Sequence, residues 1–200
     1  MLNVSVIEKH VLMLLKKELS AKLTYHNVAH SVDVITQCMA IAKAEGITDE
    51  ETLTDLHIAA IYHDAGFIFV YNGHEEKGCE MAREQLPGFG VTNASIENIC
   101  TLIMATKMPQ SPANHLQKII CDADLDYLGR EDFFSISSNL CKEVLAYKIA
   151  DNKMEWKERQ MLFLQSHTYF TQSSRQNRTP VQLQHIKKLA DEKNNEKAKF

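Results

Sequence analysis

The chain has 200 residues, of which 44% are hydrophobic and 24% are charged, and its formal net charge is −4. This length and composition predict one soluble globular domain, which buries enough surface to fold without disulfides or a structural metal. The negative net charge argues against a nucleic-acid partner, which usually requires a clustered basic face, so none is expected.

Apolar residues recur at helical spacing through the first two thirds of the chain, and glycine and proline fall between these segments. Thr48 to Glu51 has the pattern of a capping box, which predicts a helix start. The aromatic stretch from Phe67 to Gly73 predicts a buried loop. The helices that the periodicity predicts span residues of about 4–20, 27–45, 48–64, 73–86, 96–106 and 115–128.

The rest of the chain also shows helical spacing, from Ile136 to Leu145 and around Trp156. Thr179 and Pro180 predict a further helix start, because proline is favoured at the first helical position. The chain is therefore predicted to be an all-α bundle of about eight or nine helices. We expect a core at residues 1–130 and C-terminal helices at residues 131–200 that pack on the same domain.

Cysteine usage and hydropathy indicate where the protein works. The five cysteines are odd in number and show no C-x-x-C spacing, which predicts reduced thiols and a cytoplasmic location. No apolar run approaches the roughly 18 residues of a transmembrane helix, so no membrane association is expected. The N-terminus lacks the pattern of a secretory signal. The sequence leaves the oligomeric state open.

Two pairs of candidate metal ligands occur in the first third of the chain. His26 and His30 are four residues apart, so in a helix they lie on one face, one turn apart. His63 and Asp64 follow an almost wholly apolar segment. Because a buried, unpaired charge is costly, His63 and Asp64 require partners or a metal.

A third acidic segment follows the apolar residues that precede Cys121. In a helix Asp122 and Asp126 share one face and Asp124 points elsewhere, so the segment offers two alternative ligands, Asp122 or Asp124. Neighbouring carboxylates repel one another unless a cation compensates them. Two imidazoles and two carboxylates suit one divalent transition metal ion, such as Mn, Fe, Zn, Co or Ni. Such a set leaves coordination positions open for water or substrate.

From Tyr25 to Leu128 these motifs resemble those of HD-domain metal-dependent phosphohydrolases. The opening Tyr-His-Asn-x-x-His is also similar to a motif of cyclic-nucleotide phosphodiesterases in the same superfamily. The resemblance implies that His26 is the general acid. It favours Asp124 as the fourth ligand, because Ala-Asp-Leu matches the last family motif, with Asp122 as the alternative. The implied metal ligands are His30, His63, Asp64 and Asp124.

Two further residues bear on the number of metal ions. His74 begins an H-x-x-x-G turn, whose histidine binds a second ion in some relatives. Two-metal relatives have further histidines where this chain has Thr106 and Lys107. A charged lysine is a poor ligand but can hold a phosphate, which favours a single ion. We therefore expect His74 and Lys107 to act catalytically beside His26.

The resemblance implies an enzyme that hydrolyses a phosphomonoester or phosphodiester with a water activated by the metal. The phosphodiesterase-like opening favours a nucleotide or cyclic nucleotide as the small-molecule substrate. The segment after His63 and Asp64 lacks a glutamate that is frequent in relatives acting on guanosine polyphosphates or deoxynucleoside monophosphates, which argues against both. The residues expected to contact the substrate are Tyr25, Asn27, Glu75 and Arg130.

Two other functions remain open from the sequence. The first is a non-catalytic regulatory module that has kept the metal site. The second is a di-iron oxygenase of the same superfamily. The oxygenase needs additional histidines for a second iron, and Lys107 argues against it.

Overall fold

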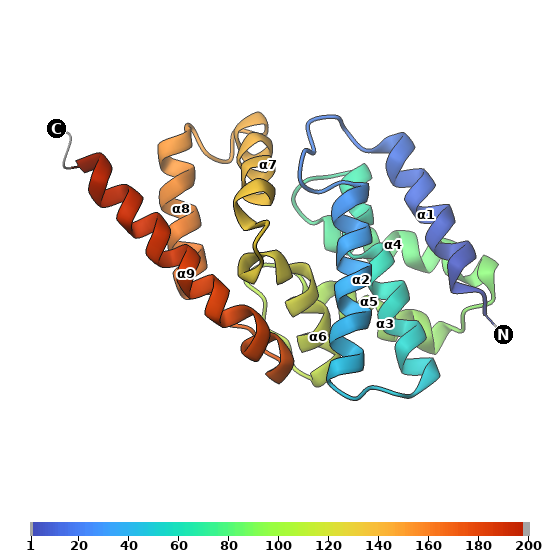
Figure 1. The fold of residues 1–200 in the computed structure, drawn as a ribbon. Helices are drawn as coiled ribbons and strands as arrows, with labels where there is room; N and C mark the ends of the chain where they lie inside the picture. Colours follow the sequence, from blue (N-terminus) through green and yellow to red (C-terminus); the bar gives the residue numbers. More distant parts are fainter. Residues whose placement is uncertain (1, 198–200) are drawn as a thin grey trace.

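The structure is a computed structural model and describes residues 2–197. In that part of the chain it contains nine α-helices, three short 3₁₀ helices and no strand, which confirms the predicted all-α bundle (Figure 1). The α-helices are α1 (Val4–Glu18), α2 (Val28–Ala44), α3 (Glu50–Tyr62), α4 (His74–Gln85), α5 (Asn93–Ala105), α6 (His115–Asp124), α7 (Phe133–Ala146), α8 (Lys153–Ser166) and α9 (Gln172–Lys197). The 3₁₀ helices are η1 (Ala65–Ile68), η2 (Leu86–Phe89) and η3 (Asp126–Gly129).

Side-chain caps explain where several helices begin. The Asn27 side chain accepts a hydrogen bond from the Ala29 amide at 2.9 Å, and the Asp49 side chain accepts one from the Thr52 amide at 2.8 Å. These bonds satisfy amides that the first helical turn leaves without a partner. The cap of α3 is thus Asp49, one residue after the Thr48 that the capping-box pattern indicated.

Helices α1 to α6 share one hydrophobic core. Its fully buried members include Val11, Leu56, Ile61, Ile99 and Ile103. Complete burial of one such side chain contributes about 1.5–3 kcal/mol. Helix α2 packs against both α3 and α6. This packing brings together the start of α2 and the ends of α3 and α6, where the predicted metal ligands lie.

Helices α7 to α9 lie on the opposite side of α2 and α6 from α1, so that α1 and the end of α9 are far apart (Figure 1). A second cluster of buried side chains joins them to the segment after α6. Its members include Tyr25, Leu128, Phe133, Leu164 and Tyr169. The expected division near residue 130 stays a prediction, and the presence of two clusters supports it.

The predicted helix start at Thr179 is wrong, because α9 already begins at Gln172 and contains Pro180. Proline removes one intrahelical hydrogen bond, and tertiary bonds on both sides of it support the helix. Arg178 Nε donates to Asp126 at 2.7 Å, and Gln182 Nε2 donates to the Leu164 carbonyl at 2.9 Å.

The segment from Phe67 to Gly73 is only partly the buried loop that we expected. Phe67 is buried and lies in η1, whereas Phe69 is 62% exposed. Of the aromatic side chains in this segment, only Phe67, which packs between His26 and His74, is buried.

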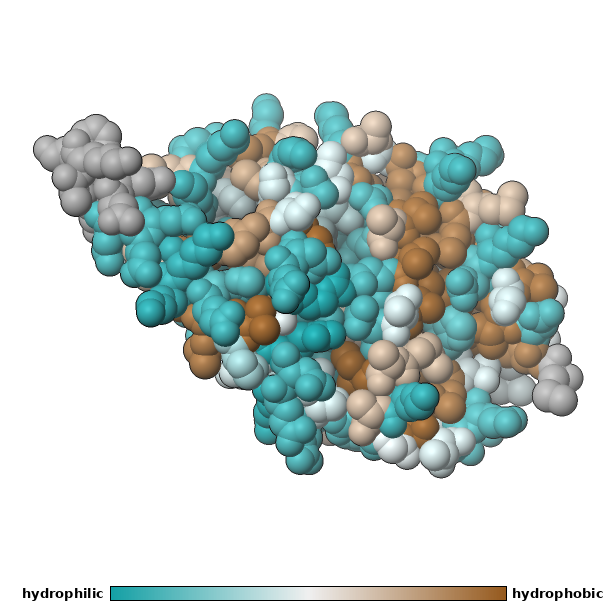
Figure 2. Space-filling view, viewed as in Figure 1, coloured by the Kyte–Doolittle hydropathy of each residue, from teal (hydrophilic) through white to brown (hydrophobic). Residues whose placement is uncertain are grey.

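The surface of the molecule is mixed in character. Figure 2 shows hydrophobic side chains along the seam between α1 and α2, whereas the visible side chains of α9 are mostly hydrophilic. Among residues 2–197, none of the helices combines the length and the apolar character that crossing a membrane requires.

Candidate metal centre

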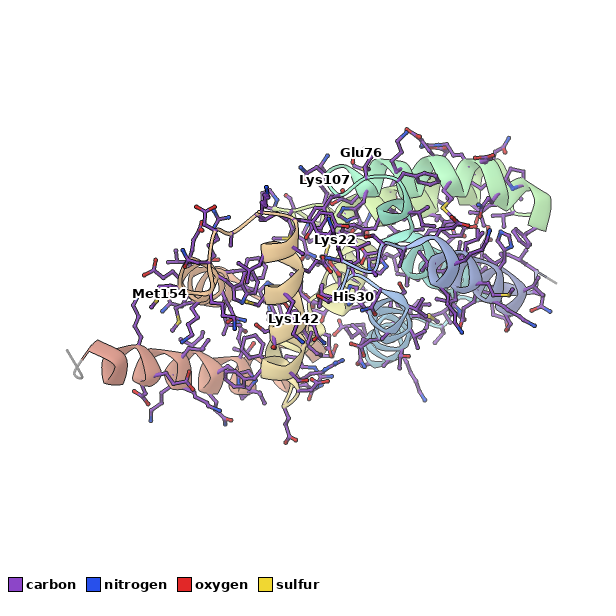
Figure 3. The ribbon with its side chains drawn as sticks, turned by 90° about the horizontal axis from the view of Figure 1, so that it is seen from above. Lys22, His30, Glu76, Lys107, Lys142 and Met154 are labelled. Carbon is purple, nitrogen blue, oxygen red and sulfur yellow. The ribbon has the colours of Figure 1, made fainter. Side chains whose placement is uncertain are left out.

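Four predicted ligands meet where the start of α2 lies beside the ends of α3 and α6. His30 lies in the first turn of α2, His63 and Asp64 directly follow α3, and Asp124 is the last residue of α6. Figure 3 shows His30 where the helical bundle meets the C-terminal helices. His30, His63 and Asp64 are almost fully buried, and Asp124 is partly buried.

The ligand atoms of these residues converge. His30 Nε2 lies 3.3 Å from Asp124 Oδ1, 3.4 Å from Asp64 Oδ2 and 3.5 Å from His63 Nε2. His63 Nε2 lies 3.3 Å from Asp64 Oδ2. One ligand atom from each of His30, His63 and Asp124 falls within a 4.8 Å range, close enough to hold one ion.

The chemistry of the four residues fits a cation. The buried Asp64 Oδ2 has no hydrogen-bond partner, and such a carboxylate oxygen is costly without a positive charge beside it. Burial alone would lower the pKa of His63, but Asp64 and Asp124 raise it to about 9. Burial would raise the pKa of Asp64, but His63, His26 and His30 hold it well below its usual value. Both shifts show that these carboxylates favour positive charge at this place, which a metal ion would supply.

Hydrogen bonds orient these ligands. His63 Nδ1 donates to the Ala60 carbonyl at 2.8 Å, which leaves Nε2 free to bind a metal. Gln110 Nε2 donates to Asp124 Oδ2 at 3.3 Å and leaves Oδ1 facing the histidines. Asn27 caps α2 and so fixes the turn that carries His30. Asn27, which the sequence predicted to contact substrate, uses its side-chain oxygen for this cap.

Asp122 points to a different part of the structure. It accepts hydrogen bonds from the amides of Phe170 and Thr171, both at 2.8 Å, and from the Thr171 hydroxyl at 2.7 Å. The carboxylate therefore ties the segment before α9 to α6. Of the two alternatives that the sequence left open, the structure brings Asp124 and not Asp122 to the ligand cluster.

His26 is held by a residue that the sequence analysis missed, Glu143 of α7. The buried Glu143 carboxylate accepts hydrogen bonds from the His26 ring and from the amides of Tyr25 and His26, at 2.8 and 3.0 Å for the amides. It also accepts one from the Tyr71 hydroxyl at 3.1 Å. Glu143 lies on the face of α7 that carries Leu140, so an acid at an apolar position was the signal in the sequence.

The environment of His26 favours its protonated form. Burial alone would lower the pKa of His26, but the hydrogen bond with Glu143 and the charges of Asp64 and Asp124 raise it above its usual value. Burial would raise the pKa of Glu143, and the hydrogen bond with His26 keeps it below its usual value. The pair therefore places a partly buried imidazole with a raised pKa and a buried carboxylate beside the ligand cluster.

Phe67 lies between the two other histidines of the site. It stacks on His26 with ring centroids 4.3 Å apart and on His74 with centroids 3.8 Å apart. His74 Nε2 lies 3.5 Å from both Asp64 Oδ1 and Glu75 Oε1. His74 and Glu75 thus lie next to the ligand cluster, as the sequence predicted for site residues.

The ligand cluster borders a cavity of about 360 Å³. Polar residues of the centre line part of its wall, and largely apolar residues from η3, α7 and α8 line the rest. The lining residues are Tyr25, His26, Asp64, His74, Glu75, Thr106, Met108, Asp124, Leu125, Tyr127, Leu128, Leu140, Trp156, Arg159, Gln160 and Phe163.

Three of the residues that were predicted to act catalytically or to contact substrate lie outside this wall, namely Asn27, Lys107 and Arg130. Lys107 is half-exposed and pairs with Glu76 at the surface, where both are labelled side by side in Figure 3. Arg130 and Asn27 line a second hollow of about 310 Å³, on the other side of Tyr25, to which His30 also contributes. The Arg130 guanidinium is bound by Asp33 at 2.8 Å and by Asp132 at 2.9 and 3.0 Å.

Comparisons with known proteins agree with this geometry. A family model, described as HD domain, matches residues 27–126, which is half of the chain and includes all four ligands. The chain belongs to the HD-domain family.

The structure of this HD-domain chain is similar to a crystal structure from an uncultured Thermotogales bacterium, described as a predicted HD superfamily hydrolase. The TM-score is 0.60, the sequences are 19% identical, and the match covers 92% of this chain and 91% of the other. At this identity the likeness shows the fold. No curated protein matches the chain significantly. The HD-domain match confirms the family that the motifs indicated and supports a metal-dependent hydrolase of unspecified substrate.

Proposed function

We propose that the protein is a metal-dependent phosphohydrolase that acts on a nucleotide or a cyclic nucleotide. One observation carries this proposal. The ligand cluster of His30, His63, Asp64 and Asp124 borders a cavity of ligand size through its two aspartates, and His26, whose pKa is raised, lines the same wall. This arrangement supplies a cation site and an acid to one bound molecule.

A divalent transition metal held by these four residues would lower the pKa of a bound water and polarise a phosphoryl oxygen. The proposal uses one ion. In the described residues, His30, His63 and Asp124 form the one group of three or more His, Cys, Asp or Glu side chains that could hold an ion. Thr106 and Lys107 occupy the place where two-metal relatives have histidines.

His26 is assigned the role of general acid. Glu143 fixes its ring through Nδ1, so Nε2 is the atom that can deliver a proton to the leaving oxygen. A neutral alcohol leaves far more readily than an alkoxide. Transfer of this proton is therefore the step for which the pair is built.

Neighbouring residues hold the substrate in this scheme. His74 Nε2, with its Nδ1 donating to the Tyr71 carbonyl at 3.0 Å, is oriented to contact a phosphate oxygen near Asp64. Tyr25 packs its ring on His30, with ring centroids 4.5 Å apart, and forms part of the cavity wall next to this histidine. All five cysteines are free thiols, which supports a cytoplasmic location for the protein.

Metal analysis of protein purified without added metal tests the proposal first. About one divalent ion per chain is expected. A panel of nucleotides and phosphodiesters with Mn, Co and Ni should then reveal turnover. His63→Ala should lose both metal and activity while its circular dichroism stays helical. A folded His63→Ala variant with undiminished turnover, or a wild-type protein that binds none of these ions, would contradict the proposal.

A further inference from the structure

The cavity has two chemically different sides. The metal side is lined by Asp64, Asp124, His26 and His74, and the α8 side is lined by apolar and aromatic residues. The apolar and aromatic members of the α8 side are Met108, Leu128, Leu140, Trp156 and Phe163, and its polar members are Arg159 and Gln160. A molecule that fills the cavity must therefore be polar at one end and apolar at the other.

Two polar side chains of the α8 side, Arg159 and Gln160, contact partners in the protein. Arg159 is the one cationic side chain of the α8 side in the part of the chain that the structure describes, and its guanidinium is bound by Glu155 at 2.6 Å. The Gln160 amide donates to the Ser137 hydroxyl. Apart from this ion-paired arginine and this amide, the α8 side is lined by apolar and aromatic side chains, which favour a ring system over a second phosphate or a sugar.

Trp156 and Phe163 are the side chains on which a flat ring can stack. Both are partly exposed rather than buried in the core, so their faces remain available to a ligand. Aromatic side chains bind planar ring systems by stacking, and this contact tolerates different rings. A cavity of about 360 Å³ lies at the small end of the roughly 300–1,000 Å³ range for ligand sites, which suits one small molecule.

From these observations, and resting on the proposed function, we propose that the α8 side binds an aromatic ring system in the leaving alcohol of the substrate, with Trp156 as the residue that determines this specificity. Leu140, Trp156 and Phe163 all lie outside residues 27–126, the segment that matches the HD domain. The matched segment holds the metal ligands, and the C-terminal helices select what is attached to the phosphate.

The chain itself provides the readout, because Trp156 is its single tryptophan. Protein as purified is titrated with adenosine 5′-monophosphate while Trp156 fluorescence is recorded. Ribose 5-phosphate, which carries the same phosphate and sugar without the ring system, is the matched ligand. We expect saturable quenching by the nucleotide and a half-saturation concentration at least about tenfold higher for ribose 5-phosphate, the size of one stacking contact.

Variants separate stacking from general packing. Calorimetry should show that Trp156→Ala loses the preference for the nucleotide, whereas Trp156→Phe keeps most of it. Leu162→Ala is the control, since Leu162 lies on the same helix, is 66% exposed and does not line the cavity. If Trp156→Ala fails to fold, Phe163→Leu takes its place and should weaken nucleotide binding severalfold.

Equal affinity for the two ligands, or a folded Trp156→Ala variant that keeps the preference, would overturn this inference. Binding is read from fluorescence and calorimetry, and hydrolysis is assayed separately, so the two proposals fail separately. Nucleotide-selective binding without hydrolysis of any phosphoester would count against the proposed function alone. Hydrolysis of ribose 5-phosphate as efficient as that of the nucleotide would support the proposed function and refute the role of Trp156.

Discussion

The Glu143 carboxylate binds the ring of His26 although 117 residues separate them in the sequence. The same carboxylate accepts hydrogen bonds from the backbone amides of Tyr25 and His26, so it holds both the side chain and the backbone of this histidine. Because Glu143 belongs to α7, the C-terminal helices take part in building the centre. His26 is thus positioned by a part of the chain outside the HD-domain match.

Replacing Glu143 by glutamine should lower kcat by about tenfold or more, because the acid loses the partner that keeps it protonated and oriented. The pKa of His26 is raised in the folded protein, so the wild type keeps its acid form to higher pH. In Glu143→Gln the pKa falls, and the alkaline limb of the pH–rate profile should move to lower pH. Glu131→Gln, an exposed acid just before α7, serves as control. An unshifted profile in Glu143→Gln would argue against the pair.

The neighbouring acids Asp122 and Asp124 should respond oppositely to substitution by asparagine. Asp124→Asn should abolish metal binding, because Asp124 Oδ1 faces the histidines. Asp122→Asn should keep the metal but lower stability by about 1–3 kcal/mol, because the amide places a donor against the amides of Phe170 and Thr171. Metal analysis and thermal unfolding of both variants measure these effects. Loss of metal in Asp122→Asn with normal stability would restore Asp122 as the ligand.

Lys107→Met should change kcat/KM by no more than about twofold and stability by less than about 1 kcal/mol, since an exposed ion pair contributes little. We expect these small effects because Lys107 pairs with Glu76 at the surface and does not line the cavity. His26→Ala, measured alongside, should reduce kcat by about a hundredfold or more. A comparable loss in Lys107→Met would return this lysine to the phosphate-binding role that the sequence suggested.

Gly66→Ala should destabilise the protein by about 1–3 kcal/mol or more, because the helices around the metal ligands have no room for a methyl group. A Cβ at Gly66 would lie 1.9 Å from the His74 carbonyl oxygen, so η1 and α4 would have to separate. Gly88→Ala is the matched control, since a Cβ there meets nothing within 4 Å. Thermal unfolding compares the two. Equal melting temperatures would show that α4 is not held against η1 as described.

Much of the metal centre was predictable because its ligands lie in short local patterns. His63 and Asp64 follow an apolar helix, and His30 follows a motif whose asparagine caps the next helix. These features depend on neighbours within one or two turns, which the sequence displays directly. The all-α class was predictable for the same reason, since helical periodicity is local. Thr179 marks the limit of such reasoning, because distant hydrogen bonds hold α9 helical through Pro180.

The sequence by itself thus determined the helical class and the family, and it named His30, His63 and Asp64 as candidate ligands. Only the tertiary structure decided between Asp122 and Asp124, paired Glu143 with His26, moved Lys107 to Glu76 and placed Trp156 on the cavity wall. The physical reason is that each of these outcomes depends on which side chains meet when helices distant in the chain pack together. The residues next to a position in the sequence do not indicate which distant side chains will contact it.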